Sequence, residues 1–169
     1  MTSRLRIALE LAVTADGLRL EPVDDAPGLV LLVDEDGMPG PWPVTVAIDD
    51  SSVLVHAHLP MLIPTEQLGP VAELLHRANW GLVEGAIELD YDEASARVRA
   101  GADGVASGDE DRRVAQLLDL VADLVAVYGP AIADVLEGAT IPAEAIERAE
   151  ADGDDPDGSD LGGPGGNEH

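Results

Sequence analysis

Apolar side chains alternate with polar ones, or form short unbroken runs, in five segments between residues 29 and 98. This period of two is typical of β-strands that bury one face. Turn-forming residues from Asp49 to Ser52, and the dipeptide Asp92-Glu93, join two pairs of these segments and predict two hairpins. A two-residue turn at the second site places Glu88 opposite Arg97, a charge-complementary pair that fixes the register. The five predicted strands are 29–33, 44–48, 53–59, 83–89 and 94–98.

Helical spacing of apolar residues marks three other stretches of the chain. Residues 66–78 carry an apolar face, and residues 112–128 are apolar at almost every position. The pair Gly129-Pro130 predicts a break or kink in this long helix, which resumes over 131–137. A last short helix is expected over 142–149, where Pro142 lies in the first turn.

The N-terminal stretch, residues 4–15, fits two patterns. Its apolar residues alternate strictly, which indicates a strand. Its content of Leu, Ala and Glu, and the stop at Asp16-Gly17, favour a helix. We favour the helix, and the strand stays open as the alternative.

The long helix carries two apolar seams, although a sheet can cover only one of them. A helix on the surface of a domain normally shows a single apolar stripe. The second seam must therefore meet the N-terminal helix, the second helix or another molecule, and the sequence leaves these alternatives open. The first seam is Val114, Leu118, Val121 and Val125; the second, a candidate partner or dimer seam, is Leu117, Leu120, Leu124 and Val127.

Three short motifs resemble the YbjN family, proposed bacterial sensory transduction regulators related in fold to Tir/CesT-type type III secretion chaperones. They are Leu74-Leu75-His76-Arg77-Ala78-Asn79, Gly85-Ala86-Ile87-Glu88-Leu89-Asp90 and the segment Tyr128-Gly129-Pro130 through Gly138. The resemblance implies a small α+β domain with an antiparallel sheet, in the order helix-β-β-β-helix-β-β-helix. It also implies a protein that is usually dimeric, binds other proteins and has no catalytic activity.

The C-terminal residues 150–169 differ in kind from the rest of the chain. They contain seven acidic residues, no Arg or Lys, and runs of Gly and Pro. Such a segment buries too little apolar surface to offset its ordering entropy, so we expect a disordered acidic tail. The predicted organisation is one α+β domain over 1–149 followed by this tail over 150–169.

Composition narrows the partners that the chain can have. Nine Arg, no Lys and 34 acidic residues give a formal charge of −25, which argues against binding nucleic acid or an anionic membrane. The acidity fits either a salt-rich host or a GC-rich genome. With no Cys and no apolar run of ~20 residues, disulfides and a membrane span are not expected. We expect a cytoplasmic protein.

Few residues suggest site chemistry. His56 and His58 share one face of a predicted strand and are candidate metal ligands, but no third ligand has a telling spacing. No nucleophile elbow or phosphate-binding loop occurs, so we expect neither an enzyme nor a bound cofactor. Trp42, Met61 and Ile63 lie in loops and are candidates for contacts with a partner, or for loops that pack down on the sheet.

These patterns favour a non-catalytic protein-interaction module, chaperone-like or regulator-like. It would bind an apolar segment of a partner protein or a second copy of itself, as a homodimer. The alternative is a small metal-dependent regulator or enzyme that uses His56 and His58.

Overall fold

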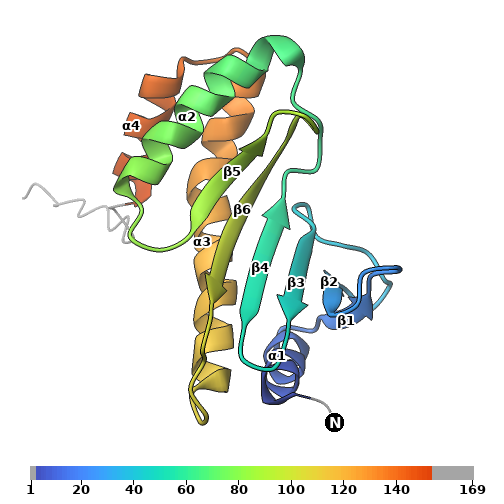
Figure 1. Cartoon of the computed structure of the whole chain (residues 1–169). Coiled ribbons are helices and arrows are strands. Elements are labelled where there is room, and N and C mark those ends of the chain that lie inside the picture. Colours follow the sequence, from blue (N-terminus) through green and yellow to red (C-terminus); the bar gives the residue numbers. More distant parts are fainter. Residues whose placement is uncertain (1–2, 154–169) are drawn as a thin grey trace, which may run out of the picture.

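The computed structural model describes residues 3–153 and confirms the predicted α+β class. Six antiparallel strands form one sheet in the order β1-β2-β3-β4-β6-β5. Four α-helices pack at one face and one edge of this sheet (Figure 1). The strands are β1 (Arg19–Pro22), β2 (Leu29–Val33), β3 (Val44–Ile48), β4 (Val53–His58), β5 (Ala86–Asp90) and β6 (Ser95–Ala102). The helices are α1 (Arg4–Ala15), α2 (Leu68–Gly81, after the short 3-10 turn η1, Thr65–Gln67), α3 (Glu110–Leu136) and α4 (Pro142–Gly153).

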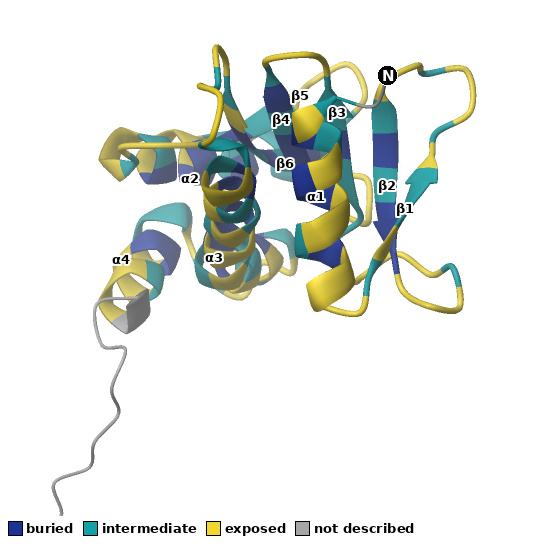
Figure 2. Cartoon of the chain, turned by 90° about the horizontal axis from the view of Figure 1, so that it is seen from below, coloured by how far each residue is buried: buried dark blue, intermediate teal, exposed yellow. Residues whose placement is uncertain are grey.

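Each helix has a distinct place around the sheet. The long helix α3 packs across the inner face of β4 and β6, and α1 lies against α3 and β1. Helix α2 flanks the edge strand β5, and α4 packs outside α2 and α3 (Figures 1 and 2). The opposite, outer face of β4, β6 and β5 has no helix over it among residues 3–153 (Figure 1).

The N-terminal stretch is a helix, which resolves the ambiguity of its sequence. Leu5, Ala8, Leu9 and Val13 are buried, at the spacing of one helical face. The intervening Ile7 and Leu11 are exposed, because the residues that alternated in a strand pattern lie on opposite sides of the helix.

The register of the second hairpin is as predicted. Glu88 pairs with Arg97 across β5 and β6, and its carboxylate accepts hydrogen bonds from Arg97 at 2.8 Å and Arg99 at 2.6 Å. At the free edge of β5, the Asn79 side chain donates to the Ile87 carbonyl and accepts from its N–H, both at 2.8 Å. Asn79 thus takes the place of a neighbouring strand and blocks part of an edge that could otherwise pair with another chain.

Three sequence predictions need correction. The sheet has six strands, not five: β1 was missed because it is a short, polar edge strand that ends in Pro22. Of the break or kink predicted at Gly129-Pro130, the break is wrong: helix α3 continues through Pro130, since burial of Tyr128, Ala131 and Ile132 outweighs one lost backbone hydrogen bond. Helix α4 reaches Gly153, so the first residues of the predicted tail are helical, and 154–169 lie outside the described residues.

Gly85, at the start of β5, is held by contacts that any side chain would disturb. Its φ is +77°, and a Cβ atom there would lie 2.8 Å from Leu124 Cδ1 and 3.2 Å from the Arg99 carbonyl oxygen. Gly104 has a similar φ of +64° but no neighbour within 4 Å of such a Cβ. The two glycines therefore separate the effect of backbone strain from the effect of packing.

We expect Gly85→Ala to lower the free energy of unfolding by about 2–4 kcal/mol, because it adds overpacking against α3 to backbone strain. The control Gly104→Ala should cost only about 1–2 kcal/mol, the strain alone. Urea unfolding followed by circular dichroism measures both values. An equal loss of unfolding free energy in both variants would show that contacts with α3 add nothing to the cost of a side chain at Gly85.

Candidate functional site

A strongly apolar groove of about 380 Å³ lies between α3, the end of α1 and the inner face of β2, β3 and β4. We call it the Trp42 groove. Apolar and small side chains form nearly all of its wall, which is the character of sites that bind apolar ligands or side chains. It is lined by Val13, Asp16, Leu18, Leu32, Pro41, Trp42, Val44, Val55, Ala57, Leu118, Asp119, Val121, Ala122, Val125 and Ala126.

Trp42 forms part of one wall because of the loop that carries it. Pro39, Gly40, Pro41 and Pro43 keep the connection between β2 and β3 out of regular structure. The half-buried indole reaches the backbone of α3, where a Cβ atom on Gly129 would lie 3.6 Å from Trp42 Cζ2. The indole therefore lies within van der Waals reach of α3 at the Tyr-Gly-Pro segment.

The first apolar seam of α3 faces this groove. Val114 and Val121 are buried, whereas Leu118 and Val125 are half-buried and line the opening. Ala122, also in the wall, is exposed. Small side chains on α3 and on β4 leave the groove unfilled, so the helix does not close completely against the sheet.

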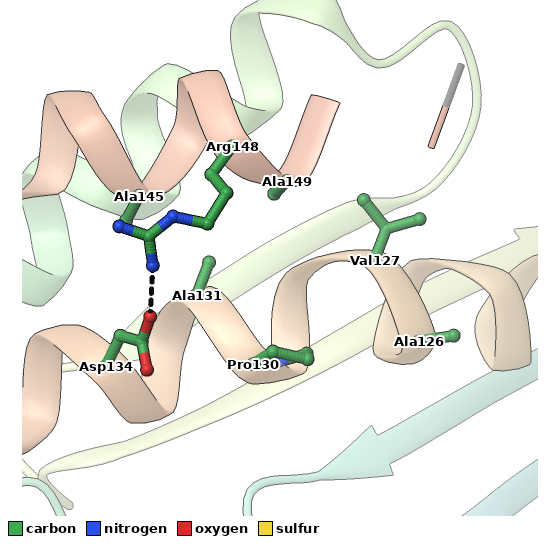
Figure 3. Close-up of a pocket in the computed structure, with 8 residues that line it drawn as sticks. All are labelled: Ala126, Val127, Pro130, Ala131, Asp134, Ala145, Arg148 and Ala149. Atoms are coloured by element: carbon green, nitrogen blue, oxygen red, sulfur yellow. Dashed lines mark hydrogen bonds and ion pairs between the residues drawn. The ribbon is translucent and has the colours of Figure 1, made fainter. Parts of the chain in front are cut away.

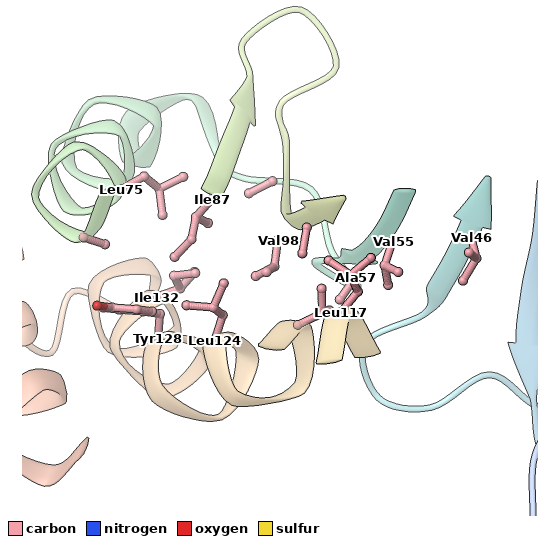
Figure 4. Packing of buried hydrophobic residues seen from close by; sticks show 14 of the residues in the cluster. Val46, Val55, Ala57, Leu75, Ile87, Val98, Leu117, Leu124, Tyr128 and Ile132 are labelled. Carbon is pink, nitrogen blue, oxygen red and sulfur yellow. The ribbon is translucent and has the colours of Figure 1, made fainter. Parts of the chain in front are cut away.

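The second seam, predicted for a partner or a second copy, is largely covered within the same chain. Leu117 and Leu124 are 1% and 6% exposed and point into the core (Figure 4). Leu120 is half-buried near Gly85, with its Cδ2 atom 3.7 Å from the position of a Cβ there. Both leucines are therefore covered by other parts of the same chain, which is one of the alternatives that the sequence left open.

Val127, the last residue of that seam, lines a smaller cleft between α3 and α4. This cleft has a volume of about 230 Å³, and mostly small side chains surround it (Figure 3). Arg148 of α4 reaches across it to the Asp134 carboxylate at 2.7 Å. The ion pair joins the two helices beside the cleft, which leaves less room for a partner than the Trp42 groove.

The other predicted contact residues divide into two groups. Ile63 is 2% exposed and belongs to the core, because its N–H donates to the Ala94 carbonyl and draws the loop onto the sheet. Met61 remains 55% exposed. The loop therefore packs down at Ile63 and stays open at Met61, away from the residues that line the Trp42 groove.

His56 and His58 lie on the outer face of the sheet, as their spacing predicts. Their ring centroids are 5.9 Å apart, and His58 Nε2 lies 2.9 Å from Thr45 Oγ1. His56 is buried, and its Nε2 has no hydrogen-bond partner among the described residues. No third His, Asp or Glu joins them in a metal-binding group within residues 3–153, so the structure adds no support for the metal-dependent alternative.

Burial and neighbouring charge keep both imidazoles neutral. Burial, followed by the positive charge of Arg97, lowers the pKa of His56 to about 4, and the same causes lower the pKa of His58. Burial raises the pKa of Glu88, but hydrogen bonds from Arg97 and Arg99 outweigh it and hold the pKa below its usual value. The outer face is therefore a network of paired charges around a neutral, buried histidine.

Comparisons with known proteins support the fold and little else. No family model matches the chain, and no curated protein matches its sequence. A solved structure, that of YbjN from E. coli, a proposed transcription regulator, superposes with a TM-score of 0.51 at 14% identity. The match covers 72% of this chain and 89% of YbjN. The fold is YbjN-like, as the sequence motifs led us to expect. None of the helices in the described part of the chain is long and apolar enough to span a membrane.

The depressed pKa of His56 predicts a specific loss of stability in acid. Between pH 6.5 and about 4 the unfolded chain binds a proton at His56 that the folded protein does not. The free energy of unfolding therefore falls as the pH drops through this window, by up to about 3 kcal/mol from this group. His56→Leu should remove that part of the slope in urea unfolding measured at a series of pH values.

The matched control is His76→Leu, at an exposed position of α2. A change in the pH dependence of unfolding that appears in both variants would not be specific to the buried His56. If His56→Leu and the wild type lose stability equally between pH 6.5 and 4, His56 is not held neutral by the fold.

Proposed function

We propose that this protein is a non-catalytic protein-interaction module, which binds an apolar segment of a partner protein in the Trp42 groove. The observation that carries the proposal is the groove itself, whose wall is apolar except for two carboxylates. A recess lined in this way offers burial to aliphatic side chains but no group arranged for acid–base or nucleophilic chemistry.

The expected strength of binding follows from the size of the groove. A volume of about 380 Å³ accommodates a few aliphatic side chains. Each buried side chain contributes about 1.5–3 kcal/mol before the cost of association is subtracted. We therefore expect micromolar binding of short segments, a range suited to reversible regulation or to holding a partner.

Two further features support a binding role over a catalytic one. The charged cluster on the outer face of the sheet, Glu88 with Arg97 and Arg99, is internally paired. YbjN, a structural neighbour, is described as a proposed transcription regulator and not as an enzyme. The fold alone does not fix function, so the groove and not the resemblance is the basis of the proposal.

The test blocks the groove without disturbing the core. Ala122→Glu places a charged side chain in the wall at an exposed helical position, and the matched control Ala133→Glu makes the same change on α3 outside the groove. Peptides enriched from a random phage library on the wild type should bind with micromolar Kd and change the fluorescence of Trp42, measured in a Trp80→Phe background.

Ala122→Glu should weaken this binding at least tenfold, and Ala133→Glu should leave it unchanged. Peptides that bind both variants equally would place the interaction elsewhere and contradict the proposal. Sedimentation equilibrium identifies the other occupant: a wild-type dimer that becomes monomeric only in Ala122→Glu would mean that a second copy fills the groove.

A further inference from the structure

The charges at the Trp42 groove indicate what kind of segment it takes, and this inference rests on the proposed function. Among its fifteen lining residues the only charged side chains are Asp16 and Asp119, and both are exposed. Neither forms an ion pair within residues 3–153. A ligand that fills the groove therefore meets two carboxylates without a counter-charge.

The arginines of the described residues 3–153 are all paired with other acidic side chains. All nine arginines of the chain are engaged in this way, and the chain has no lysine. The pairs involve Glu110, Glu10, Glu21, Glu73, Glu88 (twice), Asp109, Glu84 and Asp134. Because none of these arginines pairs with Asp16 or Asp119, we take the counter-charge at the groove to come from its occupant.

Asp16 also occupies a position that is unfavourable for the free protein. It is the C-cap residue of α1, where the helix dipole presents its negative end, and no basic residue lies in the last turn. A carboxylate there is repelled by the helix end, whereas a cation would be attracted to both. The negative end of α1 and the two unpaired carboxylates thus act together at one groove.

We propose that the occupant of the Trp42 groove is a segment in which a Lys or Arg stands beside aliphatic residues. The aliphatic side chains lie against Trp42, Leu118 and Val125. The cation meets Asp16 and Asp119. Because both carboxylates are exposed, the charge contributes selectivity and a dependence on salt more than it contributes affinity.

The probes are two synthetic peptides with the same leucines, one with two lysines and its twin with glutamine in place of both. The wild type should bind the lysine peptide about tenfold more tightly than the glutamine twin at low salt, and the ratio should shrink in 0.5 M NaCl. In the double variant Asp16→Asn, Asp119→Asn the ratio should fall to about one to two.

The matched control is Asp123→Asn, which removes the same charge from an exposed position of α3, one turn beyond Asp119 and outside the groove. It should keep the preference for lysine, because the attraction is local and not a property of the total charge of −25. Asp16→Asn alone should raise Tm by about 1–3 °C while it weakens binding of the lysine peptide, since it relieves the repulsion at the end of α1.

The outcomes separate this inference from the proposed function. If both peptides bind equally and Ala122→Glu abolishes both, the groove binds apolar segments but the preference for a cation is wrong. If Asp123→Asn reduces the preference as much as the double variant does, total charge and not the groove selects the ligand, and the inference is again wrong. If neither peptide binds although library-selected peptides bind the wild type and not Ala122→Glu, the inference is wrong and the proposed function stands; if no peptide of either kind binds, both fail.

Discussion

The architecture depends on the need to cover α3 on nearly all of its sides. A helix of 27 residues with apolar side chains around most of its circumference is not stable with an apolar face in water. The inner face of β4 and β6 covers one side, α1 a second, and α2 and α4 a third, whereas the stripe with Gln116, Asp119 and Asp123 stays exposed. Burial on these several sides also explains why Pro130 does not end the helix. The Trp42 groove is the place where this cover is incomplete, because Ala57, Ala122 and Ala126 are too small to fill it.

Ion pairs between arginines and carboxylates add to this packing. The chain has 34 acidic residues and nine arginines. Each arginine joins two parts of the structure or stabilises a turn of helix. Pairs such as Arg148–Asp134 and Arg113–Glu84 link elements that are distant in sequence. Exposed pairs of this kind add little stability individually. With every arginine paired, the remaining carboxylates leave the chain with a formal charge of −25.

Much of the fold could be predicted from the spacing of apolar residues and from the turn-forming residues. The incorrect predictions have physical causes. The hairpin register at Glu88 and Arg97 followed from the charge pattern and the turn. Strand β1 was not predicted because it is an edge strand with few apolar residues. Its Arg19 and Glu21 form an ion pair with each other on the outer face. The groove could be predicted only in part. The seam that contains Leu118 and Val125 was visible, but which seam the sheet covers depends on the rotation of α3, and sequence spacing does not fix that rotation.

The two seams of α3 are equally apolar, so a binding site on this helix is located by which apolar side chains remain exposed. Leu117 and Leu124 are as apolar as any residue of the helix, and they are buried in the hydrophobic core (Figure 4). Apolar residues at the edge of the core, such as Leu118 and Trp42, stay half-buried because the opposing side chains are small. A small residue opposite a large one costs stability, through an unfilled space, unless a ligand occupies it. The same argument applies to Asp16, whose charge is unfavourable at the end of α1 until a cation arrives. Both features weaken the free protein at one place, and the partner that we propose would relieve both.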